Sequence, residues 1–177
     1  MSNVLAQLDS LDDTTYTLEC GACEFRSHCM CPLAPIKSSS SITDLMVIAE
    51  KPSFEEESAA FAFGDRHHKY LTSMLNGIFD NIYYTYLLKC FTGISTLLNK
   101  TNTKTCREKW LELEISKFQP KKILCLGTLC AKILGPKAKF GEIKNRYGFW
   151  QSAAFVYMSG QKHQKDFLDF LHKLKHS

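Results

Sequence analysis

The chain has 177 residues, a length that suits one domain with its own buried core. Hydrophobic residues make up 45% and charged residues 23%, as is typical of a soluble globular protein. The net charge of +4 permits a nucleic-acid partner but does not require one. There is no signal-peptide pattern and no apolar run near the roughly 20 residues of a membrane helix. We expect no membrane association and an intracellular location (cytoplasm, nucleoid-like compartment or nucleus) with reduced cysteines.

Four cysteines gather in an N-terminal loop that has neither helical nor strand periodicity. The loop covers about residues 18–43 and contains Cys20, Cys23, Cys29 and Cys31. No apolar pattern holds it on a core. We therefore expect a metal or a cluster to fix it.

The rest of the chain alternates short apolar runs with helical patterns. Strands are predicted at residues 45–49, 82–88, 122–126 and 153–157. A first helix is predicted at about residues 65–79, with Asp65 as its N-cap. A second is predicted to begin at Thr105, which forms a capping-box pattern with Glu108. Two more are predicted at residues 129–134 and through Phe167–Leu174. The alternation predicts a three-layer α/β/α fold with a four-stranded parallel sheet, in one domain over residues 1–177.

The run at residues 82–90, I-Y-Y-T-Y-L-L-K-C, has the apolar, β-branched and aromatic character of a strand buried on both faces. Ligands of open α/β sheets sit at the carboxyl ends of the strands. Tyr86, Lys89 and Cys90 therefore lie where chemistry is expected.

Cys90 follows this strand and Cys106 opens a helix, so both can face the N-terminal loop. With Cys20 and Cys23 they would supply four thiolates, the ligand set of a [4Fe–4S] cluster, which Zn²⁺ also accepts. The alternative is a local zinc knuckle of Cys20, Cys23, Cys29 and Cys31. Cys125 and Cys130 are expected to be buried core residues.

In order and spacing, several segments between Cys20 and Lys175 resemble the iron–sulfur (family four) uracil-DNA glycosylases. The family's G-E-A-P-G motif corresponds to Ala49-Glu50-Lys51-Pro52-Ser53, and its P-F-x-G motif to Ala60-Phe61-Ala62-Phe63-Gly64. Its Y-x-T-N-x-x-K-C motif corresponds to Tyr83-Tyr84-Thr85-Tyr86-Leu87-Leu88-Lys89-Cys90. Its P-K-x-I-x-x-L-G-x-x-A motif corresponds to residues 120–131. The resemblance implies DNA as partner. It also favours a [4Fe–4S] cluster on Cys20, Cys23, Cys90 and Cys106 over the knuckle.

The departures from the family pattern concern the base pocket, for which the resemblance indicates Lys51, Phe61, Phe63, Tyr86 and Ser159. Tyr86 replaces the Asn that reads uracil, and residues 156–160, matched to the family's H-P-S motif, contain no histidine. Lys51 stands where some relatives carry a water-activating Asp. Glu50 and a stacking Phe, either Phe61 or Phe63, are what remains. We predict that catalysis is impaired.

The first functional hypothesis is a non-catalytic member of this fold that binds DNA or a replication or repair protein. Its phosphate contacts would be Arg66, His67, Lys89 and Arg146. The second is an active glycosylase in which Tyr86 stacks on uracil or another modified base. The third is an interaction module without DNA binding, which would dock a partner through an acidic loop at residues 55–57 and the aromatic residues Phe149 and Trp150.

Overall fold

The computed structural model describes Cys23, Phe25, Leu33, Ile36–Lys37, Leu98 and residues 42–93 and 103–177. Within this part, six strands form one sheet in the order β1-β3-β2-β4-β6-β5. Their bounds are Ile36–Lys37 (β1), Leu45–Ala49 (β2), Ile82–Tyr86 (β3), Lys122–Leu126 (β4), Ile143–Lys144 (β5) and Tyr147–Trp150 (β6). Among the described residues, no helix combines the length and the apolar character needed to cross a membrane.

The predicted parallel core is confirmed. Strand β2 pairs in parallel with β3 and β4, and β4 pairs in parallel with β6. The two-residue strands β1 and β5 add antiparallel edges. They are too short to give an alternation in the sequence.

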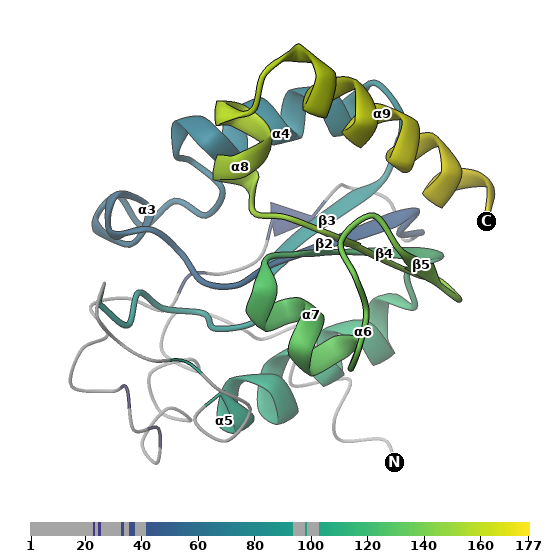
Figure 1. Ribbon diagram of the computed structural model, residues 1–177. Helices are drawn as coiled ribbons and strands as arrows, with labels where there is room; N and C mark the ends of the chain where they lie inside the picture. Colours follow the sequence, from purple (N-terminus) through teal and green to yellow (C-terminus); the bar gives the residue numbers. More distant parts are fainter. Residues whose placement is uncertain are drawn as a thin grey trace.

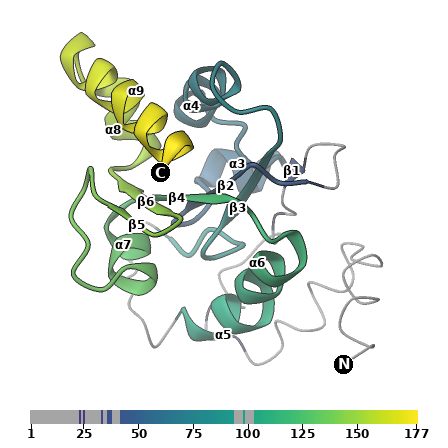
Figure 2. The same ribbon diagram turned by 90° about the vertical axis from the view of Figure 1, so that its right-hand side faces the viewer.

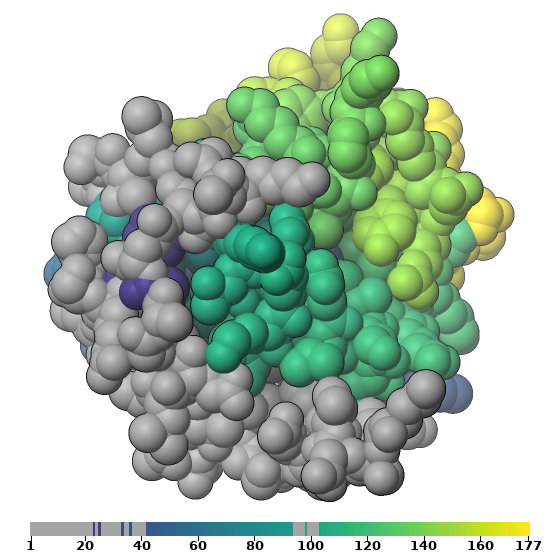
Figure 3. Space-filling view, turned by 90° about the horizontal axis from the view of Figure 1, so that it is seen from below, coloured from purple at the N-terminus to yellow at the C-terminus, as the bar shows by residue number. Residues whose placement is uncertain are grey.

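Helices cover both faces of the sheet, as the three-layer prediction requires (Figures 1 and 2). One face carries α4 (Arg66–Asn76), α8 (Ala153–Met158) and α9 (Gln161–His176). The other carries α5 (Lys104–Cys106), the π-helix η3 (Arg107–Leu111), α6 (Glu112–Phe118) and α7 (Thr128–Leu134). Seen from below, α5 to α6 (teal) and α7 with its following loop (green) reach the surface (Figure 3).

The position predicted for the fourth strand is wrong. Residues 153–158 form α8, because the Ser152 hydroxyl accepts a hydrogen bond from the Phe155 N–H and caps a helix there. The fourth parallel strand is β6, which ends at Trp150. The error shifts the carboxyl end of this strand, and with it the position of the site residues that follow.

Two helix starts also differ from the prediction. The helix expected from Thr105 begins at Lys104, and no side chain caps it. Residues 55–57 lie in α3 (Phe54–Ser58), where Ser53 and Glu56 cap each other reciprocally. Asp65 is confirmed as the N-cap of α4, since its carboxylate accepts the His68 N–H at 2.8 Å.

Candidate functional site

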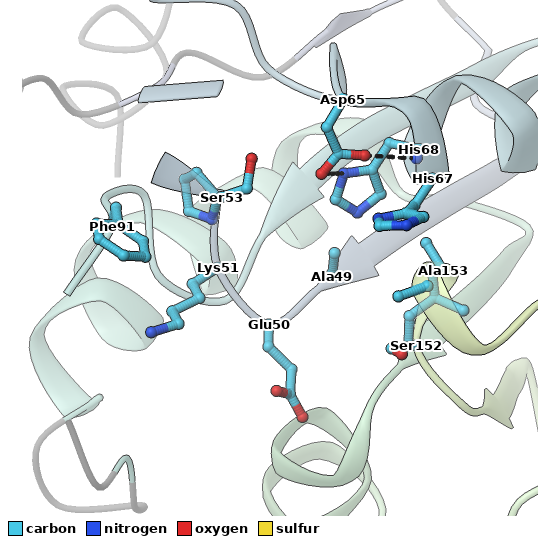
Figure 4. Close-up of a pocket in the computed structure, with 13 residues that line it drawn as sticks. Ala49, Glu50, Lys51, Ser53, Asp65, His67, His68, Phe91, Ser152 and Ala153 are labelled. Carbon is cyan, nitrogen blue, oxygen red and sulfur yellow. Dashed lines mark hydrogen bonds and ion pairs between the residues drawn. The ribbon is translucent and has the colours of Figure 1, made fainter. Parts of the chain in front are cut away.

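A cavity of about 250 Å³ lies at the carboxyl ends of β2 and β4 (Figure 4). The turn at residues 49–53, the start of α4, Phe91 and the start of α8 line it. This is the position at which ligands bind in open α/β sheets.

Tyr86 ends strand β3, with its ring centre 6.0 Å from that of His68, which lines the cavity. Its side chain is buried, 1% exposed, and its ring stacks on Phe63 with the ring centres 4.6 Å apart and the planes at 28°. The Tyr86 hydroxyl accepts a hydrogen bond from the Phe63 N–H at 2.8 Å. Burial and the nearby charge of Glu56 raise the pKa of Tyr86 far above its usual value, so the hydroxyl stays protonated.

Glu56, Asp65 and His68 form a buried polar cluster at the edge of the cavity. His68 Nδ1 lies 2.8 Å from Glu56 Oε1 and 3.4 Å from Asp65 Oδ2. Burial alone would lower the pKa of His68, but its hydrogen bonds to the two carboxylates raise it to about 9. His68 lowers the pKa of Asp65 and of Glu56 against the opposing effect of burial. The cluster therefore holds an imidazolium between two carboxylates at neutral pH.

The same three side chains offer ligand atoms that all lie within 4.8 Å of one another. Sequence reasoning missed this cluster, because an acidic run and an N-cap look like solvated features. Its only sequence signal is the capping-box spacing from Ser53 to Glu56.

Glu50 and Lys51 both turn away from the centre of the cavity (Figure 4). The Glu50 carboxylate accepts the Leu129 N–H at 2.5 Å, at the first turn of α7. Lys51 Nζ donates to the carbonyl of Gly93 at 2.6 Å and lies 5.0 Å from the centre of the Phe91 ring. Burial lowers the pKa of Lys51. The carboxylate and the ammonium group thus hold two flanking segments in place.

The structure separates the other residues expected in the base pocket. Phe63 stacks inside, whereas Phe61 is 57% exposed on the surface. Ser159 caps the C-terminus of α8 and donates to the Val156 carbonyl at 3.1 Å, outside the cavity lining. Because β6 ends at Trp150, the residues after the fourth strand are 151–154, Gln-Ser-Ala-Ala, which again include no histidine.

The four expected phosphate contacts also separate. Arg66 is exposed at the start of α4, with its guanidinium 5.8 Å from the Tyr157 ring, and His67 lines the cavity. Lys89 is 1% exposed and forms an ion pair with Glu114 at 2.8 Å, a position that no phosphate can reach. Arg146 donates to the Pro120 carbonyl at the amino end of β4, opposite the cavity. Lys89 and Arg146 therefore do not fit a DNA contact at this site.

Of the cysteines expected to bind a cluster, Cys23 and Cys106 pack against the same hydrophobic cluster. Cys23 packs against a small cluster that contains Cys106, Phe25 and Trp110. Cys90 is buried one residue before Phe91, and the Lys89 carbonyl accepts the Leu33 N–H at 2.6 Å. Cys20, Cys29 and Cys31 lie outside the described residues.

Cys125 and Cys130 are fully buried in β4 and α7, as expected of core thiols. Burial raises the pKa of both thiols. Neither is therefore in the thiolate form that binds a metal.

Most of the surface proposed for a pure interaction module is buried, and of its three acidic residues only Glu55 is exposed. Glu56 and Glu57 are buried, and Glu57 Oε1 accepts the Phe91 N–H at 3.0 Å. Phe149 is fully buried, and Trp150 packs against Phe170 with ring centres 4.8 Å apart. These side chains hold the fold together and offer no docking face.

Comparison with known protein families gives a match over most of the chain. The family model described as "Uracil DNA glycosylase superfamily" matches residues 37–175. The match includes strands β2 to β6, the cavity and nearly all of α9.

Proposed function

The chain belongs to the uracil DNA glycosylase superfamily, and we propose that it binds DNA without releasing a base. The observation that carries this proposal is the position of Tyr86. An enzyme that acts on a base in DNA flips that base into a pocket and stacks it between aromatic or apolar side chains. Here the inner face of Phe63 is already covered by the Tyr86 ring.

The Tyr86 ring is held in this position by polar contacts as well as by packing. Its hydroxyl accepts the Phe63 N–H at 2.8 Å in a buried environment, close enough to the Glu56 carboxylate for that charge to raise its pKa. A base that displaced the ring would leave the buried Phe63 N–H without its partner, at a cost of about 1–3 kcal/mol. Tyr86 therefore acts as a built-in substitute for a stacked base.

The charged groups around the cavity are likewise committed to structural contacts. Glu50 binds the α7 backbone and Lys51 binds the loop at residues 92–93. Neither side chain points toward the centre of the cavity (Figure 4). This arrangement supports a loss of catalysis rather than a change of mechanism.

The outer rim of the cavity keeps features suited to DNA. Arg66 and Lys69 are exposed on the first turn of α4, beside His67. Tyr157, 5.1 Å from the His67 ring, is an exposed aromatic residue. Cations bind backbone phosphates and an exposed ring stacks on a base. We place this role in DNA replication or repair, with a protein of that machinery as a further partner, inside the cell.

We also propose a [4Fe–4S] cluster on Cys20, Cys23, Cys90 and Cys106, with zinc as the alternative. The contacts of Cys23 with the Cys106 cluster, and of Leu33 with the strand end before Cys90, support it. The chemistry of four thiolates fits either metal centre. In this position the group would join the N-terminal segment to β3 and α5.

A base-release assay tests the main proposal directly. Oligonucleotides that contain uracil, hypoxanthine or xanthine are incubated with the protein and then treated with alkali, which cleaves abasic sites. We expect no cleavage, together with salt-sensitive retention of the DNA that weakens in Arg66→Ala. The matched control is Arg146→Ala, which removes an arginine from the opposite end of the sheet and should leave retention unchanged.

A second candidate function is an active glycosylase for a modified base. One observation favours it: His67 and His68 both line a cavity that retains about 250 Å³. Release of a modified base that is lost in His68→Gln, a variant that must still bind DNA, would establish this function in place of the first.

A further inference from the structure

A second cavity, of about 430 Å³, lies on the other side of α7 and has no part in the function proposed above. Its floor includes Ala131 and Ala138, and its rim carries Lys132, Lys137, Lys139 and Phe140. All three lysines are exposed, and the Phe140 ring is 43% exposed. We refer to this cavity as the lysine pocket.

The lysine pocket carries more positive than negative charge. Within the part of the chain that the structure describes, none of its three lysines forms an ion pair. One acidic residue, Glu142, interacts with Lys139: its carboxylate accepts the Lys139 N–H at 2.8 Å, and it also lies 3.5 Å from Lys144 Nζ. The pocket wall itself includes no carboxylate. The site therefore attracts anions.

Lys132 lies on α7, and the loop that carries Lys137 and Lys139 is held by backbone hydrogen bonds. The Ala138 N–H donates to the Gly135 carbonyl at 2.7 Å, and the Gly141 N–H donates to the Phe149 carbonyl at 2.8 Å. Phe149 in turn donates to the Glu142 carbonyl at 3.0 Å, which ties the loop to β6. Because the backbone is already ordered, ligand binding should lose little conformational entropy in this loop.

We propose that the lysine pocket binds a segment of unpaired nucleic-acid strand. The lysines would contact two or three backbone phosphates, and Phe140 would stack on a base. Cations combined with an exposed ring on an apolar floor are typical of single-strand binding surfaces. An acidic peptide would use the lysines equally well but would gain little from the ring, which is why a nucleic acid is the better occupant.

The two cavities are neighbours across the first turn of α7. Thr128 lines the lysine pocket, and the next residue, Leu129, donates its N–H to Glu50, which lines the first cavity. A strand bound at the first cavity would thus have a second contact close by. The inference goes beyond the proposed function because it does not involve the base pocket.

Fluorescence anisotropy with a labelled oligothymidylate tests the inference. Lys132→Ala/Lys137→Ala should weaken binding at least tenfold and reduce the slope of log affinity against log salt by about 1.4, from about 0.7 per lost phosphate contact. The matched control, Lys165→Ala/Lys173→Ala, removes the same charge from exposed positions of α9 and should change affinity less than threefold. Phe140→Ala should weaken binding roughly fivefold to a hundredfold, and Phe140→Trp should retain it.

Three outcomes would overturn the inference: equal losses in the pocket and control variants, no loss in the pocket variant, or competition by polyglutamate with no effect of Phe140→Ala. The last outcome would instead assign the pocket to an acidic protein. Thermal melts of each variant verify folding. If Arg66→Ala weakens binding and the pocket variants do not, the inference fails and the proposed function stands. If the protein releases a base while the pocket variants still weaken binding, the proposed function fails and the inference stands.

Discussion

The Tyr86 hydroxyl accepts a hydrogen bond from the backbone N–H of Phe63 at 2.8 Å while the two rings stack 4.6 Å apart. The residue that closes the pocket and the ring against which a base would stack are thus joined by both polar and apolar contacts. The core packing fixes Tyr86 in this position, because the residue lies on β3 beside Ala49 of β2.

Removal of this hydroxyl should cost stability. Tyr86→Phe leaves the buried Phe63 N–H without its partner, so we expect the free energy of unfolding to fall by about 1–3 kcal/mol. Tyr84→Phe, on the same strand, is the control: its hydroxyl makes a long, part-buried 3.5 Å contact with Asn76 and holds no backbone N–H, so its loss should cost clearly less. Urea denaturation measures both. Equal losses would show that the Tyr86 hydroxyl has no special role.

Tyr86→Asn should open the pocket without restoring efficient catalysis. The smaller side chain uncovers the face of Phe63, so a free uracil or thymine base should bind more tightly than to the wild type. Base release should remain near background, since residues 151–154 still provide no histidine and Lys51 still faces Gly93. Titration of free base and the alkali-cleavage assay measure the two effects separately. Rapid base release by Tyr86→Asn would show that the rest of the machinery is intact.

The Glu56–Asp65–His68 cluster should make stability depend on pH. The pKa of His68 is about 9 in the folded chain and about 6.5 when unfolded, so its contribution is fully present below about pH 6.5 and is lost as the pH rises through 9. The pKa values of Asp65 and Glu56 are lowered, so their contribution is present above their ordinary values, 3.8 and 4.5, and is lost at more acidic pH.

Thermal melts between pH 4 and pH 10 test this dependence. We expect the wild type to be most stable near pH 5–6, and the loss between pH 6.5 and pH 9 to be on the order of 2–3 kcal/mol. In His68→Gln this alkaline loss should disappear, whereas His172→Gln, at an exposed position of α9, should leave it intact. An unchanged profile in His68→Gln would contradict the assignment.

Lys89 and Glu114 form a buried ion pair, and replacement of one partner alone should strongly destabilise the fold. Lys89 also donates to Thr85 and to the Tyr86 carbonyl, so Lys89→Met leaves a buried carboxylate unpaired and should cost about 3–5 kcal/mol. The double variant Lys89→Met/Glu114→Leu should recover part of this loss. The exposed pair of Lys121 and Asp44 is the comparison, and Lys121→Ala should cost about 1 kcal/mol or less. A double variant less stable than Lys89→Met would contradict the pairing.

The visible absorption of cysteine variants should distinguish the cysteines that bind a metal from those buried in the core. If a [4Fe–4S] cluster is bound, the protein is brown, and Cys90→Ser and Cys106→Ser each lose the broad visible absorption. Cys125→Ala should keep it, because Cys125 lies inside β4. A colourless protein that contains zinc would replace the cluster with the alternative metal. A full cluster retained in both Cys90→Ser and Cys106→Ser would exclude this ligand set.

The parallel core was predictable because β2, β3 and β4 are short apolar runs buried on both faces. Strand β6 was not, since Gly148 and a turn at Asn145 interrupt its pattern while the apolar residues that follow it are helical. The burial of Glu56, Glu57 and Lys89 could not be predicted either. A charged residue reads as solvated unless its partner is known, and Glu56 lies 12 residues from His68 and Lys89 lies 25 residues from Glu114.

The hydrogen bond from Leu129 to Glu50 also has a mechanical consequence. It fastens the turn after β2 to the first turn of α7, and Gly127, with φ +97°, leaves no room there for a side chain. The walls of the two cavities are therefore joined by a direct hydrogen bond. A ligand that pushed α7 aside would have to pull on the neighbouring turn, so occupancy on one side of the helix would be felt on the other.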